Sequence, residues 1–277
     1  MEKYRLLREQ LEASGVFRFA VGPLAEREDL LRVHDEGYVE RFLQGELSRE
    51  ELRRIGFPNE KELVTRTLSS TGATTAAASV ALEEGACGVL AGGTHHAHRD
   101  FGSGFCVLND IAVSAARLLA QGEAERIAVI DLDVHQGDGT AAIFAGEPRV
   151  FTFSAHGRHN FPFRKQRSDL DLEFENATQG AEYLAALDGA LEQVFRWEPD
   201  FVFYQAGVDA LASDRLGKLA LEAEDLAERD RRVLSRCYKT GLPVVITLGG
   251  GYSEPIAHTV HAAAQTFRLA REIYFPA

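Results

Sequence analysis

The chain has 277 residues, 45% of them hydrophobic and 26% charged, so it can bury the core of one large α/β domain. Its 30 basic and 42 acidic residues give a net charge of −12, which argues against a nucleic-acid-binding surface and leaves room for cationic substrates. Three dispersed cysteines indicate neither a disulfide framework nor a cysteine-rich zinc site, and without a secretory leader or an apolar run long enough to cross a membrane we expect a cytoplasmic protein.

Short apolar segments alternate with longer helical patterns along the chain. The strand candidates lie near residues 88–91, 127–133, 149–154, 200–206 and 243–248. The helix candidates lie near residues 62–84, 109–121, 178–196, 221–240 and 256–273. This rhythm predicts a single three-layer αβα domain over residues 1–277, with a mostly parallel sheet covered on both faces. Ligands of such sheets bind at the carboxyl ends of the strands.

Two histidines follow the first predicted strand. After the apolar segment Cys87 to Ala91 comes a Gly-Gly turn and then His95-His96. Adjacent side chains do not share one face, so at least one imidazole points into the cleft that the turn borders. On its own such a pair is more often a surface turn or a buried imidazole with satisfied hydrogen bonds than a functional site.

The second predicted strand ends in the most polar segment of the chain. Asp131, Asp133 and His135 alternate along Asp131 to Gly139, so strand geometry would project all three to one side. Crowded carboxylates repel one another unless a divalent cation lies between them. The pattern therefore indicates a metal site, with a solvated acidic turn as the alternative.

Two later strand ends add a carboxylate and a phenol. Asp209 follows the apolar run that starts at Phe201, and Tyr252 follows the triple glycine Gly249-Gly250-Gly251. Glycines in that number are usually kept where the backbone turns sharply or moves. The alternative is that Tyr252 is an aromatic residue at the rim of the cleft that only packs on the surface. We predict that the charge-dense helix Glu222 to Arg232 presents a solvated face and has no functional role. The sequence contains no phosphate-binding loop motif.

Five motifs follow one another in a fixed order between residues 92 and 252. They are His95-His96 behind their Gly-Gly turn, Gly104-Phe105-Cys106-Val107-Leu108-Asn109-Asp110, the Asp131 to Gly139 segment, Ala206-Gly207-Val208-Asp209 with Asp214-Arg215-Leu216-Gly217, and Gly249-Gly250-Gly251-Tyr252. In this order they resemble the histone deacetylase family. Gln136 and the 214–217 run resemble most the class IV branch and its bacterial relatives. The resemblance implies an arginase/deacetylase-type fold and zinc-dependent amide hydrolysis.

The resemblance also implies a role for each matching residue. Asp133, His135 and Asp209 match the zinc ligands. His96 matches the general base and acid, and His95 matches its electrostatic helper. Asp131 and Asp138 match the carboxylates that orient these histidines, and Tyr252 matches the donor to the oxyanion. Gly104, Phe105 and Phe161 resemble the walls of the acyl-lysine tunnel, and Leu216 resembles its rim.

Two further expectations come from the same resemblance. A structural monovalent cation such as K⁺ would be held by Asp131, Asp133, His135, Ser154 and the Ala155 backbone. Members of the family also carry an N-terminal strand and a loop rich in His, Phe and Pro before the helix that corresponds to Glu2–Ser14, and we expect this chain to lack them.

We therefore expect hydrolysis of an N-acyl amide on a primary amine, most simply acetyl-lysine in a protein or peptide. Acetylated polyamines or other small amides are the first alternative. The second is a metal-bearing module that binds acyl-lysine without turnover, which would need neither the histidine pair nor Tyr252. No nucleic acid or membrane partner is expected.

Overall fold

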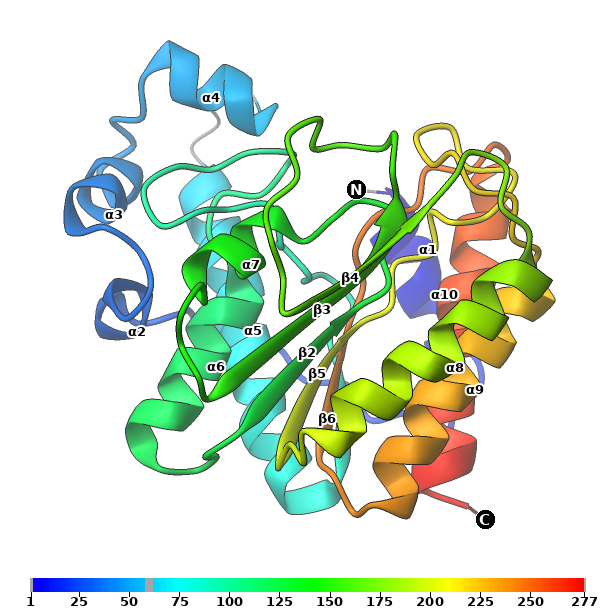
Figure 1. Ribbon diagram of the computed structural model, residues 1–277. Coiled ribbons are helices and arrows are strands. Elements are labelled where there is room, and N and C mark those ends of the chain that lie inside the picture. Colours follow the sequence, from blue (N-terminus) through cyan, green and yellow to red (C-terminus); the bar gives the residue numbers. More distant parts are fainter. Residues whose placement is uncertain (1, 58–61, 277) are drawn as a thin grey trace.

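The computed structural model describes residues 2–57 and 62–276. Within these residues one six-stranded parallel sheet lies between two layers of helices (Figure 1). The strands are β1 (Ala86–Gly88), β2 (Ile127–Asp131), β3 (Val150–Gly157), β4 (Leu170–Phe174), β5 (Phe201–Gln205) and β6 (Val244–Thr247). Their spatial order is β1-β6-β5-β2-β3-β4.

The helices cover the two faces of the sheet as separate groups. They are α1 (Glu2–Glu12), α2 (Arg27–Leu31), α3 (Glu36–Leu43), α4 (Arg49–Ile55), α5 (Glu62–Glu84), α6 (Asp110–Gln121), α7 (Asp138–Ile143), α8 (Gly180–Arg196), α9 (Ala223–Lys239) and α10 (Ile256–Tyr274). Helices α5 and α6 pack together on one face, with α2 against α6. Helices α8, α9 and α10 pack on the other face, with α1 against α10.

The central strands are apolar on both faces because both faces are covered. In β2, Ile127 and Val129 belong to the core on the α5–α6 side, whereas Ala128 and Ile130 belong to the core on the α8–α10 side. Every residue of β2, β5 and β6 is buried. Such strands read as continuous hydrophobic runs, which is why the sequence reveals them.

The predicted elements are confirmed with four differences. The first strand lies slightly earlier than predicted, at Ala86–Gly88, and β2 ends at Asp131 instead of residue 133. Strand β4 was not predicted, because it alternates apolar and acidic residues and is only half-buried at the edge of the sheet. The short helices α2, α3, α4 and α7 were not predicted either, since none is longer than eight residues. The five long helices lie where the periodicity placed them.

The exposed edge of the sheet carries charges. Asp171 and Glu173 alternate with half-buried leucines in β4, and charged side chains on an edge strand oppose pairing with another chain.

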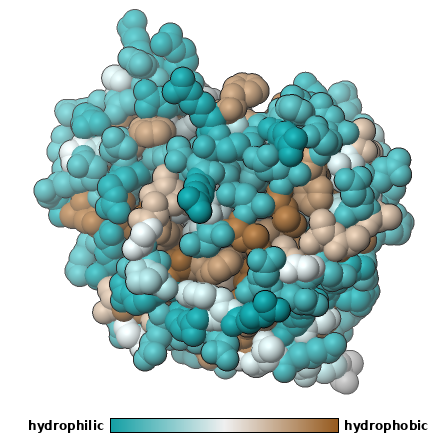
Figure 2. All heavy atoms as spheres, in the orientation of Figure 1, coloured by the Kyte–Doolittle hydropathy of each residue, from teal (hydrophilic) through white to brown (hydrophobic). Residues whose placement is uncertain are grey.

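Figure 2 shows the molecular surface from the viewpoint of Figure 1, with apolar side chains gathered near the middle of the view and hydrophilic side chains around them. None of the described helices is both long enough and apolar enough to cross a membrane.

The order of the strands reverses around β2. From β2 the chain proceeds outward to β3 and β4 and then returns to the other side of β2 as β5. In open parallel sheets this switch point leaves a crevice beyond the carboxyl ends of the strands, where ligands bind.

Candidate active site

The polar segments that follow β1, β2, β5 and β6 line or border one cavity at the carboxyl edge of the sheet. Its volume is about 360 Å³. His95 and His96 follow β1, Asp133 and His135 follow β2, and Tyr252 follows β6, and all five line this cavity. Segments far apart in sequence therefore meet where the topology places a ligand.

The compact set predicted for Asp131, Asp133 and His135 does not form, because β2 ends at Asp131 and strand alternation stops there. Asp209 takes the place of Asp131 beside Asp133 and His135, and the Asp131 carboxylate bonds His95. Asp131 Oδ1 accepts a hydrogen bond from the Asp133 backbone nitrogen at 3.1 Å. Asp133 Oδ1 accepts one from the His135 backbone nitrogen at 2.9 Å. Each carboxylate thus fixes the backbone two residues further on, which is the local bonding that short acidic side chains favour in turns.

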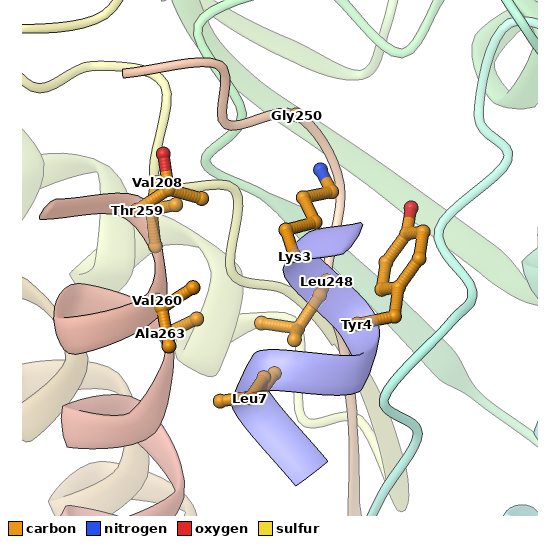
Figure 3. A pocket seen from close by; sticks show the side chains of 9 residues that line it. All are labelled: Lys3, Tyr4, Leu7, Val208, Leu248, Gly250, Thr259, Val260 and Ala263. Carbon is orange, nitrogen blue, oxygen red and sulfur yellow. The ribbon is translucent and has the colours of Figure 1, made fainter. Parts of the chain in front are cut away.

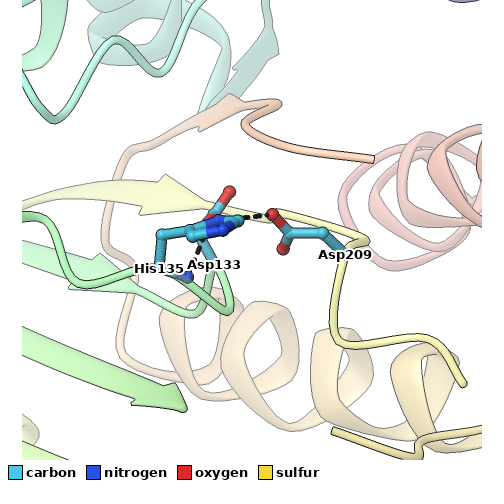
Figure 4. Close-up of side chains that lie close together, drawn as sticks. All are labelled: Asp133, His135 and Asp209. Carbon is cyan, nitrogen blue, oxygen red and sulfur yellow. Dashed lines mark hydrogen bonds and ion pairs between the residues drawn. The ribbon is translucent and has the colours of Figure 1, made fainter. Parts of the chain in front are cut away.

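Asp133, His135 and Asp209 form a compact set of metal donors. His135 Nδ1 lies 3.0 Å from Asp133 Oδ1 and 3.0 Å from Asp209 Oδ2 (Figure 4). One ligand atom from each residue lies within 4.8 Å of the others, and both carboxylates are buried. This oxygen, nitrogen and oxygen set is of the kind that holds catalytic zinc.

The electrostatics of the three residues favour a cation among them. Burial and the nearby charge of Asp133 raise the pKa of Asp209 to about 6. Burial disfavours a charged His135, but its hydrogen bonds to the two carboxylates outweigh burial and raise its pKa to about 10. Positive charge is therefore stabilised at the point where the two carboxylates meet, so the residues fit a divalent metal.

The two histidines after β1 are each held by a different carboxylate. His95 Nδ1 lies 2.6 Å from Asp131 Oδ2, and His96 Nδ1 lies 2.6 Å from Asp138 Oδ1. Their ring centroids are 4.1 Å apart.

Their pKa values shift in opposite directions. Burial opposes protonation of His95, but the charge of Asp131 prevails and raises its pKa to about 9. Burial and the neighbouring charge of His95 lower the pKa of His96 to about 4. At neutral pH the pair therefore consists of one cationic and one neutral imidazole.

The glycines before Tyr252 permit close approach to the donor set. Gly250 donates its backbone N–H to Asp133 Oδ2 at 2.7 Å, and a Cβ on Gly250 would lie 1.8 Å from Asp209 Oδ2. The Tyr252 backbone nitrogen is held by Asp214 Oδ2 at 2.6 Å. Burial and the nearby Tyr4 raise the pKa of Tyr252, so its hydroxyl stays protonated and can donate.

The four residues predicted to line a tunnel all line the cavity. They are Gly104, Phe105, Phe161 and Leu216. The Phe161 ring meets His96 edge-on at a centroid distance of 4.9 Å. Gly104 has φ +52°, and a Cβ there would lie 2.6 Å from the His96 ring, so glycine is required for conformation and for space.

Comparison with known proteins identifies the family. The Histone deacetylase domain matches residues 1–267 of the chain. The chain belongs to the histone deacetylase family. It is 45% identical to an uncharacterized protein from Picosynechococcus over 99% of this chain and 93% of that protein. It is 31% identical to Histone deacetylase 2 from Arabidopsis thaliana, over 87% of this chain and 65% of that protein.

Two of the similar proteins are named for a different substrate class, the acetylpolyamines. Acetylpolyamine amidohydrolase 1 from Pseudomonas aeruginosa is 28% identical over 82% of this chain and 78% of that protein. The crystal structure of an acetylpolyamine aminohydrolase from Burkholderia pseudomallei matches with a TM-score of 0.82 at 21% identity, over 98% of this chain and 90% of that chain. The structural match shows the arginase/deacetylase fold, and membership of the histone deacetylase family makes the chain a hydrolase that acts on amides.

Sequence reasoning missed the contribution of α1. Lys3 Nζ donates to the Gly249 carbonyl at 3.1 Å and lies 4.8 Å from the Tyr252 ring centroid. Figure 3 shows Lys3 directed from α1 toward the loop that contains Gly250. The neighbouring Tyr4 lines the active-site cavity. A lone lysine in a charged helix gives no signal of such a contact.

Other residues near the site were also missed. His98 Nε2 lies 3.0 Å from Asp138 Oδ2, so Asp138 serves two histidines, and the second lies only two residues after His96. His159 and Phe163 line the cavity from a loop that carries no recognisable motif, and Lys218 lines it directly after the Asp214-Arg215-Leu216-Gly217 motif.

Proposed function

We propose that the protein hydrolyses N-acyl lysine amides with a single zinc ion held by Asp133, His135 and Asp209. The observation that carries the proposal is the oppositely tuned pair His95 and His96 beside this donor set. A module that only binds acyl-lysine would need no such pair. When bound, zinc would lower the pKa of a water molecule and polarise the amide carbonyl.

The residues of the chain would divide the proton transfers. His96, neutral at neutral pH, donates a hydrogen bond from its Nδ1–H to Asp138 and so presents an unprotonated Nε2, which accepts a proton as water attacks the carbonyl carbon. His96 then delivers this proton to the amine nitrogen as the C–N bond breaks, which leaves a carboxylic acid and an amine. At neutral pH the proton of the acid passes to the amine, so the products are a carboxylate and an ammonium group. His95 remains cationic beside Asp131 and stabilises negative charge. The Tyr252 hydroxyl donates to the developing oxyanion.

The cavity lining favours acyl-lysine over a free polyamine. Phe105 and Phe161 supply apolar walls suited to the methylene stem of lysine. Asp133 is the one carboxylate among the described lining residues, and His159 and Lys218 also line the cavity. A polyamine would bring additional ammonium groups toward Lys218 without a carboxylate to pair with them.

We further propose a monovalent cation such as K⁺ near Asp131, Asp133, His135, Ser154 and the Ala155 backbone. In the sheet Asp131 lies opposite Ser154, which brings these groups together. We also propose a cytoplasmic location.

The test is turnover on a panel of acetyl-lysine peptides, longer acyl-lysine peptides, acetylspermidine and acetylputrescine at equal ionic strength. We expect the highest kcat/KM on an acyl-lysine peptide. A preference of tenfold or more for free polyamines, about 1.4 kcal/mol in transition-state binding, would reverse the substrate assignment and leave the chemistry standing.

Elemental analysis tests the metal assignment independently. We expect about one zinc per chain, because three protein ligands and one open position describe a single catalytic site. Asp209→Ala should lose both zinc and turnover. Two stoichiometric transition metals per chain, or full activity of zinc-reconstituted Asp209→Ala, would contradict the assignment.

A further inference from the structure

Helix α9 buries a pair of opposite charges directly beneath the site. Arg229 and Asp230 are 0% and 1% exposed, although the sequence predicts a solvated face for this part of the helix. Arg229 Nε donates to Asp230 Oδ1 at 2.9 Å. Burial of a guanidinium is costly unless its hydrogen bonds are satisfied, so the remaining contacts of Arg229 indicate what it does.

Arg229 bridges the two loops that carry the proposed metal ligands. Its Nη1 donates to the Leu132 carbonyl at 3.1 Å and to the Gly207 carbonyl at 2.7 Å. Leu132 immediately precedes Asp133, and Gly207 lies two residues before Asp209. A single nitrogen atom therefore connects the loop after β2 with the loop after β5.

Asp230 anchors the arginine to the rest of the fold. Its Oδ1 accepts a hydrogen bond from the Tyr204 hydroxyl at 2.5 Å, and its Oδ2 accepts one from the Thr266 hydroxyl at 2.6 Å. Tyr204 lies in β5 and Thr266 in α10. Asp230, the partner of the guanidinium, is thus held from two elements, β5 and α10, and it keeps the Tyr204 bond if the Thr266 bond is lost.

We propose that Arg229 is a positioning residue that fixes the distance between the Asp133 and Asp209 loops and so sets the affinity for zinc. The proposal rests on the zinc assignment above. Two buried carboxylates repel each other, and a clamp on their backbones keeps them at the separation that the metal needs. The planar fork of arginine can pair with Asp230 while another nitrogen reaches both carbonyls, whereas a lysine ammonium is a single point of contact.

The test compares Arg229→Lys with two matched controls. Thr266→Val removes a hydrogen bond to Asp230 without touching the loops. Arg232→Lys makes the same exchange in the same helix, where Arg232 contacts the Leu184 carbonyl and Asp188. The zinc dissociation constant is measured by competition with a chelator, and the Tm of each variant is measured alongside it.

We expect zinc binding of Arg229→Lys to weaken by about 10- to 100-fold, the usual effect of losing a group that orients metal ligands. Both controls should bind zinc within about twofold of wild type, even where their Tm falls. Unchanged zinc affinity in Arg229→Lys would overturn the proposal. So would a fall in the zinc affinity of Thr266→Val in proportion to its fall in Tm, because zinc affinity would then depend only on stability.

A second variant covers the case in which Arg229→Lys does not fold. The double variant Arg229→Gln, Asp230→Asn leaves no unpaired buried charge, and the same weakening of zinc binding is expected. Wild-type affinity in this variant would overturn the positioning role. A wild-type protein that binds no zinc would instead overturn the zinc assignment itself, so the two failures are distinguishable.

Discussion

At the scale of single residues, burial together with one close charged neighbour sets the protonation state of each catalytic histidine. His95 and His96 are adjacent and equally buried, yet their pKa values lie near 9 and near 4. The difference arises because His95 is ionised beside Asp131 and its charge then disfavours a second cation at His96. One pair of identical residues therefore supplies both an electrostatic group and a base.

Tyr252→Phe tests the proposed oxyanion donor. The ring is retained and only the hydroxyl is lost, so kcat should fall by about 10²–10³ with a much smaller change in KM. Steady-state kinetics on an acetyl-lysine peptide measure this, with zinc content and Tm as controls. A kcat within a few-fold of wild type would remove Tyr252 from the mechanism.

At the scale of elements, a glycine loop and a helix junction help to hold the site together. The glycine loop after β6 lies so close to Asp209 that its backbone forms part of the wall. At the junction between α2 and α3, His34 Nδ1 donates to the His98 carbonyl at 2.9 Å and Nε2 accepts from the Asn109 backbone nitrogen at 3.0 Å. His34 thus connects the first short helices with the segment that follows the catalytic histidines.

Gly250→Ala should weaken zinc binding with little loss of stability. A Cβ at this position would lie 1.8 Å from Asp209 Oδ2, so either the loop or the proposed ligand must shift. Gly189→Ala is the matched control, because a Cβ on this exposed helical glycine meets nothing within 4 Å. The control should keep its zinc affinity and gain about 0.5–1 kcal/mol of stability. Equal zinc affinities in the two variants, measured by chelator competition, would contradict the role of close approach.

His34 should make stability depend on pH. Burial lowers its pKa to about 4 from an ordinary value of 6.5, so the folded chain favours the neutral ring. Its contribution is complete above pH 6.5 and is lost as the pH falls toward 4, by about 2 kcal/mol at pH 5. Urea unfolding of zinc-free protein at pH 7 and pH 5 measures this. In His34→Gln, which does not titrate, the difference in unfolding free energy between the two pH values should be smaller by that amount, and an equal difference would refute the assignment.

Functional residues can be predicted from the sequence when their role depends on neighbours in the sequence, and not when it depends on contacts between distant segments. The proposed ligands and the histidine pair are readable because each follows a buried strand within a few residues, and parallel strands bring their carboxyl ends to one edge. Lys3 and Arg229 are not readable, since both act on backbone carbonyls far away in sequence and both lie in helices rich in charge. Strand β4 was not predicted for a related reason: its acidic residues are tolerated only at the edge of the sheet, and the tertiary structure decides which strand lies at the edge.

At the scale of the whole molecule, the net charge does not describe the charges that line the cavity. The chain carries a net charge of −12, which attracts cations from a distance. Around the cavity, however, Lys218 and His159 are among the lining residues. The overall composition therefore does not determine which amines the mouth of the site accepts.

Lys218→Glu tests this local effect. At low salt it should raise kcat/KM for acetylspermidine several-fold relative to a neutral acetyl-lysine peptide, and the gain should shrink above 0.1 M salt, where the screening length is about 10 Å. Lys239→Glu makes the same change in net charge at the far end of α9 and should leave the ratio unchanged. Equal responses of the two variants would show that only the overall field matters.

The cavity is lined from Tyr4 in the first helix to Tyr252 after the last strand, and this distribution governs when the protein becomes competent during its synthesis. Chains emerge from the ribosome with the N-terminus first. A nascent chain that ends before β5 carries Asp133 and His135 but not Asp209, and its central strand β2 still lacks one neighbour. With the proposed ligands, a complete metal site needs the chain to have been made through Asp209, so the metal can be captured only late in synthesis. Turnover in a cell-free translation reaction would then report completed chains and none of their precursors.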